Sequence, residues 1–420
     1  MFFGAAGPTP RGIDRVDMGY AARFFADPAT PNVGLVPLPG PGSMGVLSAS
    51  EARSLARVVE SHWRNGAIAK ASLEEREYPP KEAPSASAKA SERKRRSGRA
   101  ATIGRYLRMV GHARWAGFRH ASRRVPPGSL YINTGQVLLG CPAFFKWLEK
   151  RPDIRPVFML HDLIPVHHPE YSGPFLSRHH ARAVRTAARH AAALIATSRA
   201  AADELREALR GEGRTDLPIH VAPLPVDDDL LIAPGAGAAS SEPYFVMVGI
   251  IDQRKNHRMI LQVWRDMIRR DAAATPKLVI VGGRGLRVAG ILDLIARSPG
   301  LAERVVVRSG LSTPAMREIV RGARALLMPS FTEGFGLPII EALTLGVPVI
   351  ASDIPAHREV GGAHATYLDP LDGLAWRDAI LARAGEAPRA AAERMVGLPP
   401  YRPQTWASYF DEVAPFLESL

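Results

Sequence analysis

The stretch PSFTEGFGLPIIEALTLGVPVIASD, residues 329–353, decides the fold. It begins at the end of one apolar run, passes through a glycine-rich loop and enters a second apolar run after an intervening helix. Pro338 fits the first turn of that helix, where a missing N–H costs nothing, and Gly346 fits the position just beyond its end. We therefore expect a helix over 338–345. Two apolar strands joined by a helix form a parallel unit, because a parallel pair needs a crossover connection.

The same alternation of apolar strands and helical segments runs through most of the chain. In the second half the strands are expected at 244–250, 277–283, 304–310, 323–330 and 347–353. In the first half they are expected at 129–135, 156–162, 192–198 and 219–225. Continuous apolar strands between helices indicate parallel sheets covered on both faces. The sequence predicts an α/β protein with two doubly wound domains, whose ligands lie beyond the carboxyl ends of the strands.

Changes in composition divide the chain. We expect an N-terminal domain over 1–232, a linker rich in Gly, Ala and Ser over 233–243, and a C-terminal domain over 244–398. An amphipathic C-terminal helix is expected within 399–420, because its aromatic residues recur at helical spacing. A Pro-, Ser- and Ala-rich segment of about 78–98 that becomes strongly basic interrupts the first domain, and we expect a mobile excursion there.

Bulk composition restricts the class of protein. A hydrophobic content of 46% and a charged content of 23% are typical of globular proteins. The single cysteine, Cys141, excludes an internal disulfide, and its scarcity fits a reducing compartment. The beginning of the chain has neither a basic n-region nor an apolar h-region, so we expect no secretory signal and a cytoplasmic protein. The net charge of +13 favours an anionic partner.

Two glutamates flank the loop and the helix start within 329–353. Glu333 falls in the loop and Glu341 about one turn into the helix, while the N–H groups of 334–337 between them suit an anion. Carboxylates would repel a phosphate, so they belong on the hydroxyls at either side of a diphosphate. Arg254 and Lys255, just after strand 244–250, are the cations expected to neutralise that diphosphate. The layout fits a nucleotide diphosphate sugar, which has sugar hydroxyls, two phosphates and ribose hydroxyls in that order.

These residues resemble the retaining GT-B glycosyltransferases of glycosyltransferase family 4, in a mannosyltransferase-like form. The resemblance is strong over about 244–375 and weaker before it. Its strong elements are the Glu-x7-Glu frame itself, VGIIDQRKN (248–256), LVIVGGRG (278–285) and LSTPAMREIVRGARALLMPS (311–330). Its weaker elements are HDLIPVHHPEYS (161–172) and PTPRGIDRV (8–16).

The resemblance implies roles for particular residues. The catalytic residues that it implies are Glu333, His161, Arg254 and Lys255. The donor-binding residues that it implies are Gly249, Arg254, Lys255, Gly334, Phe335, Gly336, Leu337, Glu341 and Gly12. Glu333 would hold hydroxyls of the donor sugar and Glu341 those of the ribose. Arg254 and Lys255 would stabilise the leaving diphosphate. His161 would face the donor sugar from the other domain, where Gly12 would let the backbone approach.

The implied activity is transfer of a hexose with retention of anomeric configuration, the leaving phosphate accepting the proton of the acceptor. Mannose from a GDP-sugar is the expected donor, with UDP-sugars as the alternative. The acceptor would be a saccharide or lipid-linked oligosaccharide in polysaccharide biosynthesis. No cofactor and no metal is expected. The family fold places two domains across a cleft, with the C-terminal helix crossing back to the first domain.

The chain departs from the family pattern in two ways. Only MFFGAAG precedes the glycine loop, where family members usually have a full strand, and Ile250 rather than arginine follows Gly249. Arg254 and Lys255 would then neutralise the diphosphate alone.

Other interpretations stay open. The chain could be a GT-B nucleotide-sugar epimerase, or an inactive protein that binds nucleotides or nucleic acid through its basic surface. Nucleic acid is the less expected partner, because no nucleic-acid-binding motif accompanies the charge. The arginines of 176–190 recur on one helix face, which is expected either to be solvated or to contact an anionic membrane. Contact with a membrane would place the protein peripherally on the inner face of that membrane. Asp227–Asp229 reads as a polar turn rather than a metal site.

Overall fold

The computed structural model describes seven ranges of the chain. They are residues 12–27, 29–37, 44–71, 121–136, 138–231, 242–386 and 401–420. The predicted excursion of 78–98 and most of the predicted linker of 233–243 lie outside the described residues. The contacts divide the chain into two units. Unit 1 holds the described residues of Met1–Ala69, Pro84–Pro223 and Phe410–Leu420, and most of unit 2 is Leu224–Tyr409.

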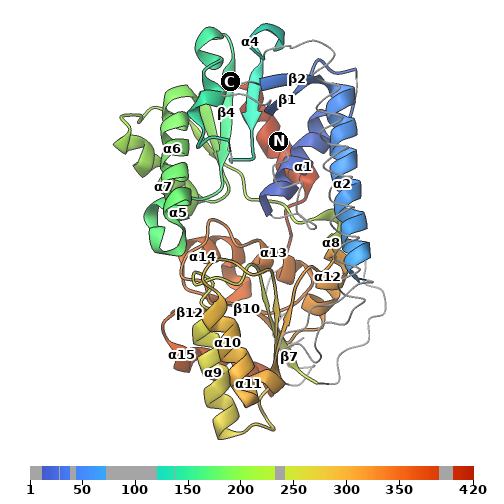
Figure 1. The fold of residues 1–420 in the computed structure, drawn as a ribbon, viewed down its shortest axis with the longest axis vertical. Helices are drawn as coiled ribbons and strands as arrows, with labels where there is room; N and C mark the ends of the chain where they lie inside the picture. The colour runs from blue at the N-terminus through green and yellow to red at the C-terminus, as the bar shows by residue number, and fades with distance from the viewer. Residues whose placement is uncertain are drawn as a thin grey trace. The chain divides into compact units, whose positions relative to one another are not determined.

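Unit 2 is built on a six-stranded sheet in which every pairing is parallel. Its strands are β7 (Tyr244–Val248), β8 (Lys277–Val281), β9 (Val305–Arg308), β10 (Ala325–Met328), β11 (Val349–Ser352) and β12 (Ala365–Leu368). Their spatial order is β12-β11-β10-β7-β8-β9, so the chain first builds outward from β7 to one side and then returns to build on its other side (Figure 1). The strand order therefore reverses between β7 and β10, and such a switch point is where doubly wound sheets bind ligands.

Helices cover both faces of this sheet. They are α9 (His257–Arg270), α10 (Ala289–Arg297), α11 (Pro299–Arg304), α12 (Thr313–Arg321), α13 (Leu337–Thr344), α14 (Pro355–Gly361) and α15 (Gly373–Ala384), with a 3-10 turn at Gly362–His364. One core joins α9, α10, α11 and α15 to alternate strand residues and includes the fully buried Trp264 and Trp376. A second core joins α12 and α13 to the intervening strand residues. This burial on both faces explains why the strands are continuously apolar.

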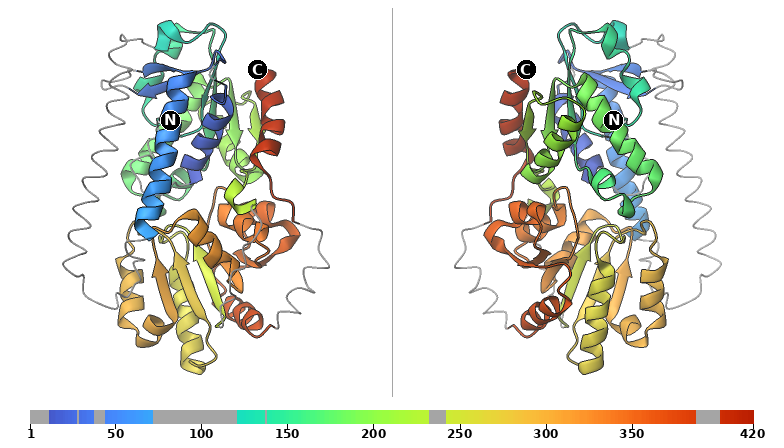
Figure 2. Two further views of the ribbon diagram at one scale, coloured as in Figure 1. Left: turned by 90° about the vertical axis from the view of Figure 1, so that its right-hand side faces the viewer. Right: turned by 90° about the vertical axis from the view of Figure 1, so that its left-hand side faces the viewer.

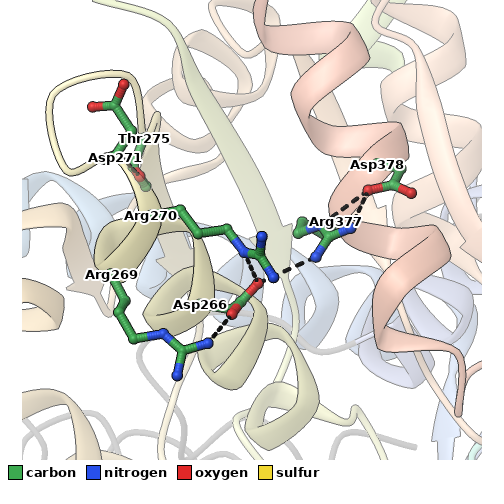
Figure 3. Close-up of polar contacts among 7 residues, drawn as sticks. All are labelled: Asp266, Arg269, Arg270, Asp271, Thr275, Arg377 and Asp378. Carbon is green, nitrogen blue, oxygen red and sulfur yellow. Dashed lines mark hydrogen bonds and ion pairs between the residues drawn. The ribbon is translucent and has the colours of Figure 1, made fainter.

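An aspartate ties two of these helices together at the surface. Asp266 of α9 accepts hydrogen bonds from Arg269 at 2.6 Å and Arg270 at 2.8 Å, which lie three and four positions further along the same helix. Arg377 of α15 also donates to it, at 3.3 Å (Figure 3). The hydrogen bond from Arg270, followed by those from the other two arginines, lowers the pKa of Asp266 to about 2. This cluster joins α15 to α9 by charge as well as by packing.

Unit 1 contains a four-stranded parallel sheet with the order β3-β4-β5-β6. Its strands are β3 (Leu130–Asn133), β4 (Arg155–Leu160), β5 (Ala193–Ala196) and β6 (Ile219–Val221). These are the four strands predicted for the first half. Their order follows the sequence, and each pairing is parallel, as the sequence predicts. Before them in the chain, β1 (Val33–Pro37) and β2 (Met44–Ser48) pair with each other as an antiparallel sheet of their own.

The helices of unit 1 flank these strands. They are α1 (Gly12–Phe24), α2 (Ala49–Ala71), α4 (Ala121–Arg124), α5 (Ile164–His167), α6 (Pro174–His190) and α7 (Arg199–Gly211), with 3-10 turns at Pro142–Phe145, Leu148–Lys150 and Pro169–Tyr171. The short α8 (Asp228–Leu231) follows in unit 2 and includes part of the acidic run 227–229. In the described part of the chain, no helix combines the length and the apolar character that crossing a membrane requires.

The last helix, α17 (Trp406–Glu418), lies within the predicted 399–420, and its end packs in unit 1 (Figure 2). The ring of Phe410 contacts Tyr20 of α1 edge-on, with centroids 5.2 Å apart. Phe416 stacks on His220 of β6 at 4.6 Å. Aromatic pairs of this kind stabilise packing beyond the area that they bury. The C-terminal residues are thus part of the core of the unit that holds the N-terminal half.

Candidate active site

Two loops of unit 2 leave the sheet side by side at the switch point. One follows β7 and carries residues 249–256, and the other follows β10 and carries residues 329–336. Because β7 and β10 are neighbouring parallel strands, their carboxyl ends meet at the same edge of the sheet. The sequence-predicted cations and the first predicted glutamate therefore come together from positions almost 80 residues apart.

The carboxylate of Glu333 lies between the two predicted cations. Its Oε2 is 2.5 Å from Nη1 of Arg254, and its Oε1 is 2.5 Å from Nζ of Lys255. All three side chains are mostly buried, with exposed fractions of 9% for Glu333, 18% for Arg254 and 10% for Lys255. Ser330 donates a further hydrogen bond to Oε1 at 2.7 Å. The arrangement is an ion-pair triad in which one carboxylate holds two cations.

The protonation of Glu333 follows from these neighbours. Burial by itself would raise the pKa of this carboxyl group, because it disfavours the charged form. The charges of Lys255 and Arg254 and the hydrogen bond to Lys255 outweigh burial and hold the pKa far below its ordinary value. Glu333 is therefore a carboxylate at neutral pH, able to accept hydrogen bonds from hydroxyls but not to donate a proton.

Backbone hydrogen bonds fix the two loops to each other. The N–H of Phe331 donates to the carbonyl of Arg254 at 2.9 Å. In return, Nη1 of Arg254 donates to the carbonyl of Thr332 at 2.7 Å. These reciprocal bonds fix where Arg254 points, and such preorganised charges are the kind that stabilise developing negative charge.

Glycines let the loop after β7 pack closely. Gly249 has φ of 135°, in the region that favours glycine. A Cβ on Gly249 would come 3.2 Å from Cε of Lys255, so the lysine stem passes directly over this residue. A Cβ on Gly282, at the end of β8, would come 1.7 Å from the carbonyl oxygen of Gly249. The predicted donor-binding residue Gly249 thus lies where Gly282 allows two loops to touch.

The helix after the second loop begins as the sequence predicts. Gly336 caps α13 with φ of 114°, Pro338 occupies its first turn and Gly346 follows its end with φ of 71°. The helix runs over Leu337–Thr344, one residue earlier than the predicted 338–345. Glu341 is buried on this helix, 5% exposed, one turn after its start. Phe335 is also buried, whereas Gly334 and Leu337 are half-buried.

Two predicted site residues belong to unit 1. His161 follows β4 and is 7% exposed. Its Nε2 lies 2.8 Å from the carbonyl of Thr134, whose hydroxyl bonds to Asp17 of α1. Burial lowers the pKa of His161, so its ring is neutral at pH 7. Gly12 is the first residue of α1, and the rest of its predicted loop, residues 8–11, lies outside the described residues. The roles of both residues stay predictions.

Several residues of the site were missed from the sequence. Ser330 supports Glu333, and Asp252 accepts a hydrogen bond from the N–H of Lys255 at 3.0 Å. Asn256 adopts a left-handed conformation with φ of 54° and donates to the carbonyl of Pro370, which anchors the start of α9. His357 of α14 is fully buried and acts electrostatically on Glu333. The signal available for His357 was its place just after strand β11, which pairs with β10.

Among the described residues, no three His, Cys, Asp or Glu side chains lie close enough together to hold an ion. The positive groups that the site itself offers an anion are Arg254 and Lys255.

Comparison with known proteins finds similarity over the region that contains this triad. Residues 242–396 match the profile of the family described as "Glycosyl transferases group 1". The mannosyltransferase WbdA of Escherichia coli is 30% identical over 227 residues, covering 50% of this chain and 27% of that protein. The O-antigen chain mannosyltransferase RfbU of Salmonella typhimurium is 33% identical over 142 residues, covering 33% of this chain and 38% of that protein. The chain spans only about a quarter to two fifths of these relatives.

Solved structures share the fold. HepE of Anabaena, solved with UDP and glucose, superposes with a TM-score of 0.53 at 19% identity, over 69% of this chain and 78% of that one. Sucrose-phosphate synthase of Thermosynechococcus elongatus gives 0.52 at 18% identity, over 76% and 78%. The predicted α/β fold class with parallel sheets, of the GT-B kind, is confirmed. The match of residues 242–396 to the glycosyl transferases group 1 profile agrees with the family that the sequence predicted for this half of the chain.

Proposed function

We propose that the chain is a glycosyltransferase that moves a hexose from a nucleotide diphosphate sugar to a saccharide acceptor. The observation that carries this proposal is the triad of Glu333, Arg254 and Lys255 at the switch point of a doubly wound sheet. Two fixed cations suit a diphosphate leaving group, and an obligate carboxylate suits sugar hydroxyls. A glycosyl transferases group 1 domain surrounds the triad.

The geometry supports a division of labour within the site. As the bond between sugar and phosphate breaks, negative charge builds on the diphosphate, and Arg254 and Lys255 would stabilise it. Both cations are ion-paired with Glu333. A diphosphate that engages them would compete with this carboxylate and free it to accept hydrogen bonds from the donor sugar. Glu341 and the backbone of 334–337 would bind ribose and phosphate.

We further propose retention of the anomeric configuration. The deeply lowered pKa of Glu333 makes it a poor general acid, and a carboxylate that accepts hydrogen bonds from the donor hydroxyls is not aimed at the anomeric carbon as a nucleophile. The leaving phosphate would then accept the proton of the acceptor on the same face of the sugar. NMR of the first product formed would show the configuration, and an inverted product would contradict this step.

GDP-mannose is the donor that we propose, and the relatives provide the support. The similar proteins of Escherichia coli and Salmonella typhimurium are named as mannosyltransferases, the latter acting on an O-antigen chain. The proposed acceptor is accordingly a growing polysaccharide or a lipid-linked oligosaccharide. A UDP-sugar is the alternative donor.

We place the protein in the cytoplasm, peripherally attached to the inner face of the membrane. The support is α6, where Arg178, Arg182 and Arg185 are exposed and Phe175 is 71% exposed beside them. Exposed arginines next to an exposed aromatic ring suit an anionic lipid surface.

The test is a thermal-shift and turnover screen with GDP, UDP, GDP-mannose and UDP-glucose. We expect stabilisation by GDP and slow release of mannose from GDP-mannose without acceptor. Formation of a new sugar nucleotide would instead identify an epimerase. Binding of duplex DNA with a steep salt dependence, without any effect of nucleotides, would identify a nucleic-acid-binding protein.

A further inference from the structure

His357 carries a buried nitrogen that has no hydrogen-bond partner among the described residues. The side chain is fully buried on α14, and its Nδ1 lies 3.0 Å from the carbonyl oxygen of Ser352. A carbonyl only accepts hydrogen bonds, so Nδ1 carries the proton and Nε2 presents a lone pair. Within the described part of the chain, Nε2 has no hydrogen-bond partner, and neither has the buried hydroxyl of Ser352.

Such an atom calls for a physical explanation. Buried polar groups are almost always paired, because an unpaired one loses its hydrogen bonds to water and gains nothing in return. Protonation of Nε2 would only add a buried charge, and burial already holds the pKa of His357 down at about 4. The ring is therefore a neutral acceptor at pH 7, and a donor group that arrives with a ligand would satisfy it.

The position of the ring indicates which ligand this is. A Cβ on Gly336 would come 3.5 Å from Cδ2 of His357, the ring carbon bonded to Nε2. The charges of Glu333, Lys255 and Arg254 lie close enough to act on the pKa of this ring. The edge of the imidazole that carries the unpaired nitrogen thus borders the turn that holds the triad.

Among the parts of a nucleotide diphosphate sugar, the diphosphate has no proton to donate at neutral pH. The donor groups are the hydroxyls of the hexose, those of the ribose and the N–H groups of the base. Glu333, the neighbour of His357, is the residue proposed for the hexose, whereas Glu341 is proposed for the ribose. We propose that Nε2 of His357 accepts a hydrogen bond from a hydroxyl of the donor hexose, next to Glu333. This inference rests on the proposed function and extends it to a residue that recognises the sugar.

Two amide substitutions separate this role from a structural one. His357→Asn keeps an N–H near the position of Nδ1, where it can still bond to Ser352, but has nothing at the position of Nε2. His357→Gln reaches the position of Nε2 and can present its amide oxygen there. We expect the Asn variant to bind GDP-mannose about tenfold or more weakly, the usual effect of losing one hydrogen bond in a buried site. Its affinity for GDP should stay unchanged, and the Gln variant should recover most of the loss.

The experiment is calorimetric titration of the full chain with GDP and with GDP-mannose, alongside turnover and thermal unfolding. His364→Asn, a histidine substitution seven residues further along the chain, is the matched control and should leave both affinities unchanged. Equal losses for GDP and GDP-mannose in the Asn variant would show that the ring only supports the fold. Wild-type affinity for both in that variant would show that Nε2 does not contact the sugar. If the wild-type chain turns over another sugar nucleotide instead of GDP-mannose, the same comparison applies to that donor and its free nucleotide: a loss in the Asn variant confined to the sugar nucleotide supports the inference, and the absence of such a loss overturns it. If the wild-type chain binds no nucleotide sugar, the proposed function fails together with this inference.

Discussion

The ion-pair triad should contribute strongly to folding, and this can be measured by removing one charge at a time. Lys255→Met removes the ammonium group and keeps the length of the side chain, while Glu333→Gln removes the carboxylate charge at constant shape. Both groups are about nine-tenths buried. Removing one partner of a buried pair costs about 3–5 kcal/mol, since the other charge loses its compensation. Arg254 stays beside Glu333 in the lysine variant, so we expect the lower end, about 3 kcal/mol.

The assay is a double-mutant cycle measured by urea unfolding at pH 7, followed through tryptophan fluorescence. With both substitutions together, the loss should be smaller than the sum of the single losses by about 2 kcal/mol, within the range known for coupled neighbours. Asp203 and Arg206 on α7 are the control pair, with a separation of 2.6 Å and exposed fractions of 74% and 50%. Their coupling should stay below about 1 kcal/mol, as for other exposed pairs.

A coupling between Lys255 and Glu333 no larger than that of the surface pair would refute the reasoning, because the carboxylate would then not be held by the lysine in solution. Turnover gives a second readout, since both single variants should lose transfer. Near-normal turnover in either variant would mean that the site is elsewhere.

Three further outcomes are expected. Gly282→Ala should lower the free energy of unfolding by about 1–3 kcal/mol, because its Cβ would overlap the carbonyl of Gly249. Gly283→Ala is the control, since a Cβ there would have nothing within 4 Å. Equal melting temperatures for the two variants would contradict the close contact. Asp266→Asn should lower the melting temperature at pH 7. The difference from the wild-type melting temperature should disappear as the pH falls through about 2, because the neighbouring arginines lower the pKa of Asp266 to that value. A difference that does not depend on pH would instead indicate lost packing. The pKa of His357 is about 4 in the folded chain, against an ordinary 6.5. Below pH 6.5 the unfolded chain therefore gains a proton at this histidine that the folded chain does not, and the free energy of unfolding falls by up to about 3 kcal/mol between pH 6.5 and pH 4. His357→Gln should flatten the curve of stability against pH in that window.

The sequence predicted the four strands of the parallel sheet in unit 1 and all but β12 of the parallel sheet in unit 2, because each is a short run of apolar residues between helices. The shape of the site was accessible for a similar reason, since Gly336, Pro338 and Gly346 each occupy the place that a loop and a helix require. The strands themselves are shorter than predicted, as at β10, because the last residues of each apolar run bend into the loops.

Other features depend on contacts that no local pattern encodes. The pair β1 and β2 was missed because a glycine interrupts each short segment and a proline ends β1, and β12 was missed because its four residues are only half-buried. The support that Ser330 gives to Glu333, and the unpaired nitrogen of His357, follow from which loops the tertiary structure brings together. A motif search identifies the charged residues of the site, but not the neighbours that set their protonation.

The strand order has a consequence for how this protein can change. The two loops of the triad come from adjacent strands, yet the chain between them builds β8, β9 and their helices entirely on one flank of the sheet. Insertions or deletions in the connections of that flank far from Gly282 would lengthen or shorten the periphery and leave the spacing of the charges alone. Unit 2 can therefore acquire new outer surfaces, and new binding partners on them, while the residues of the triad stay in place. Laboratory evolution that targets those connections should yield many active variants, and far fewer when it targets 249–256.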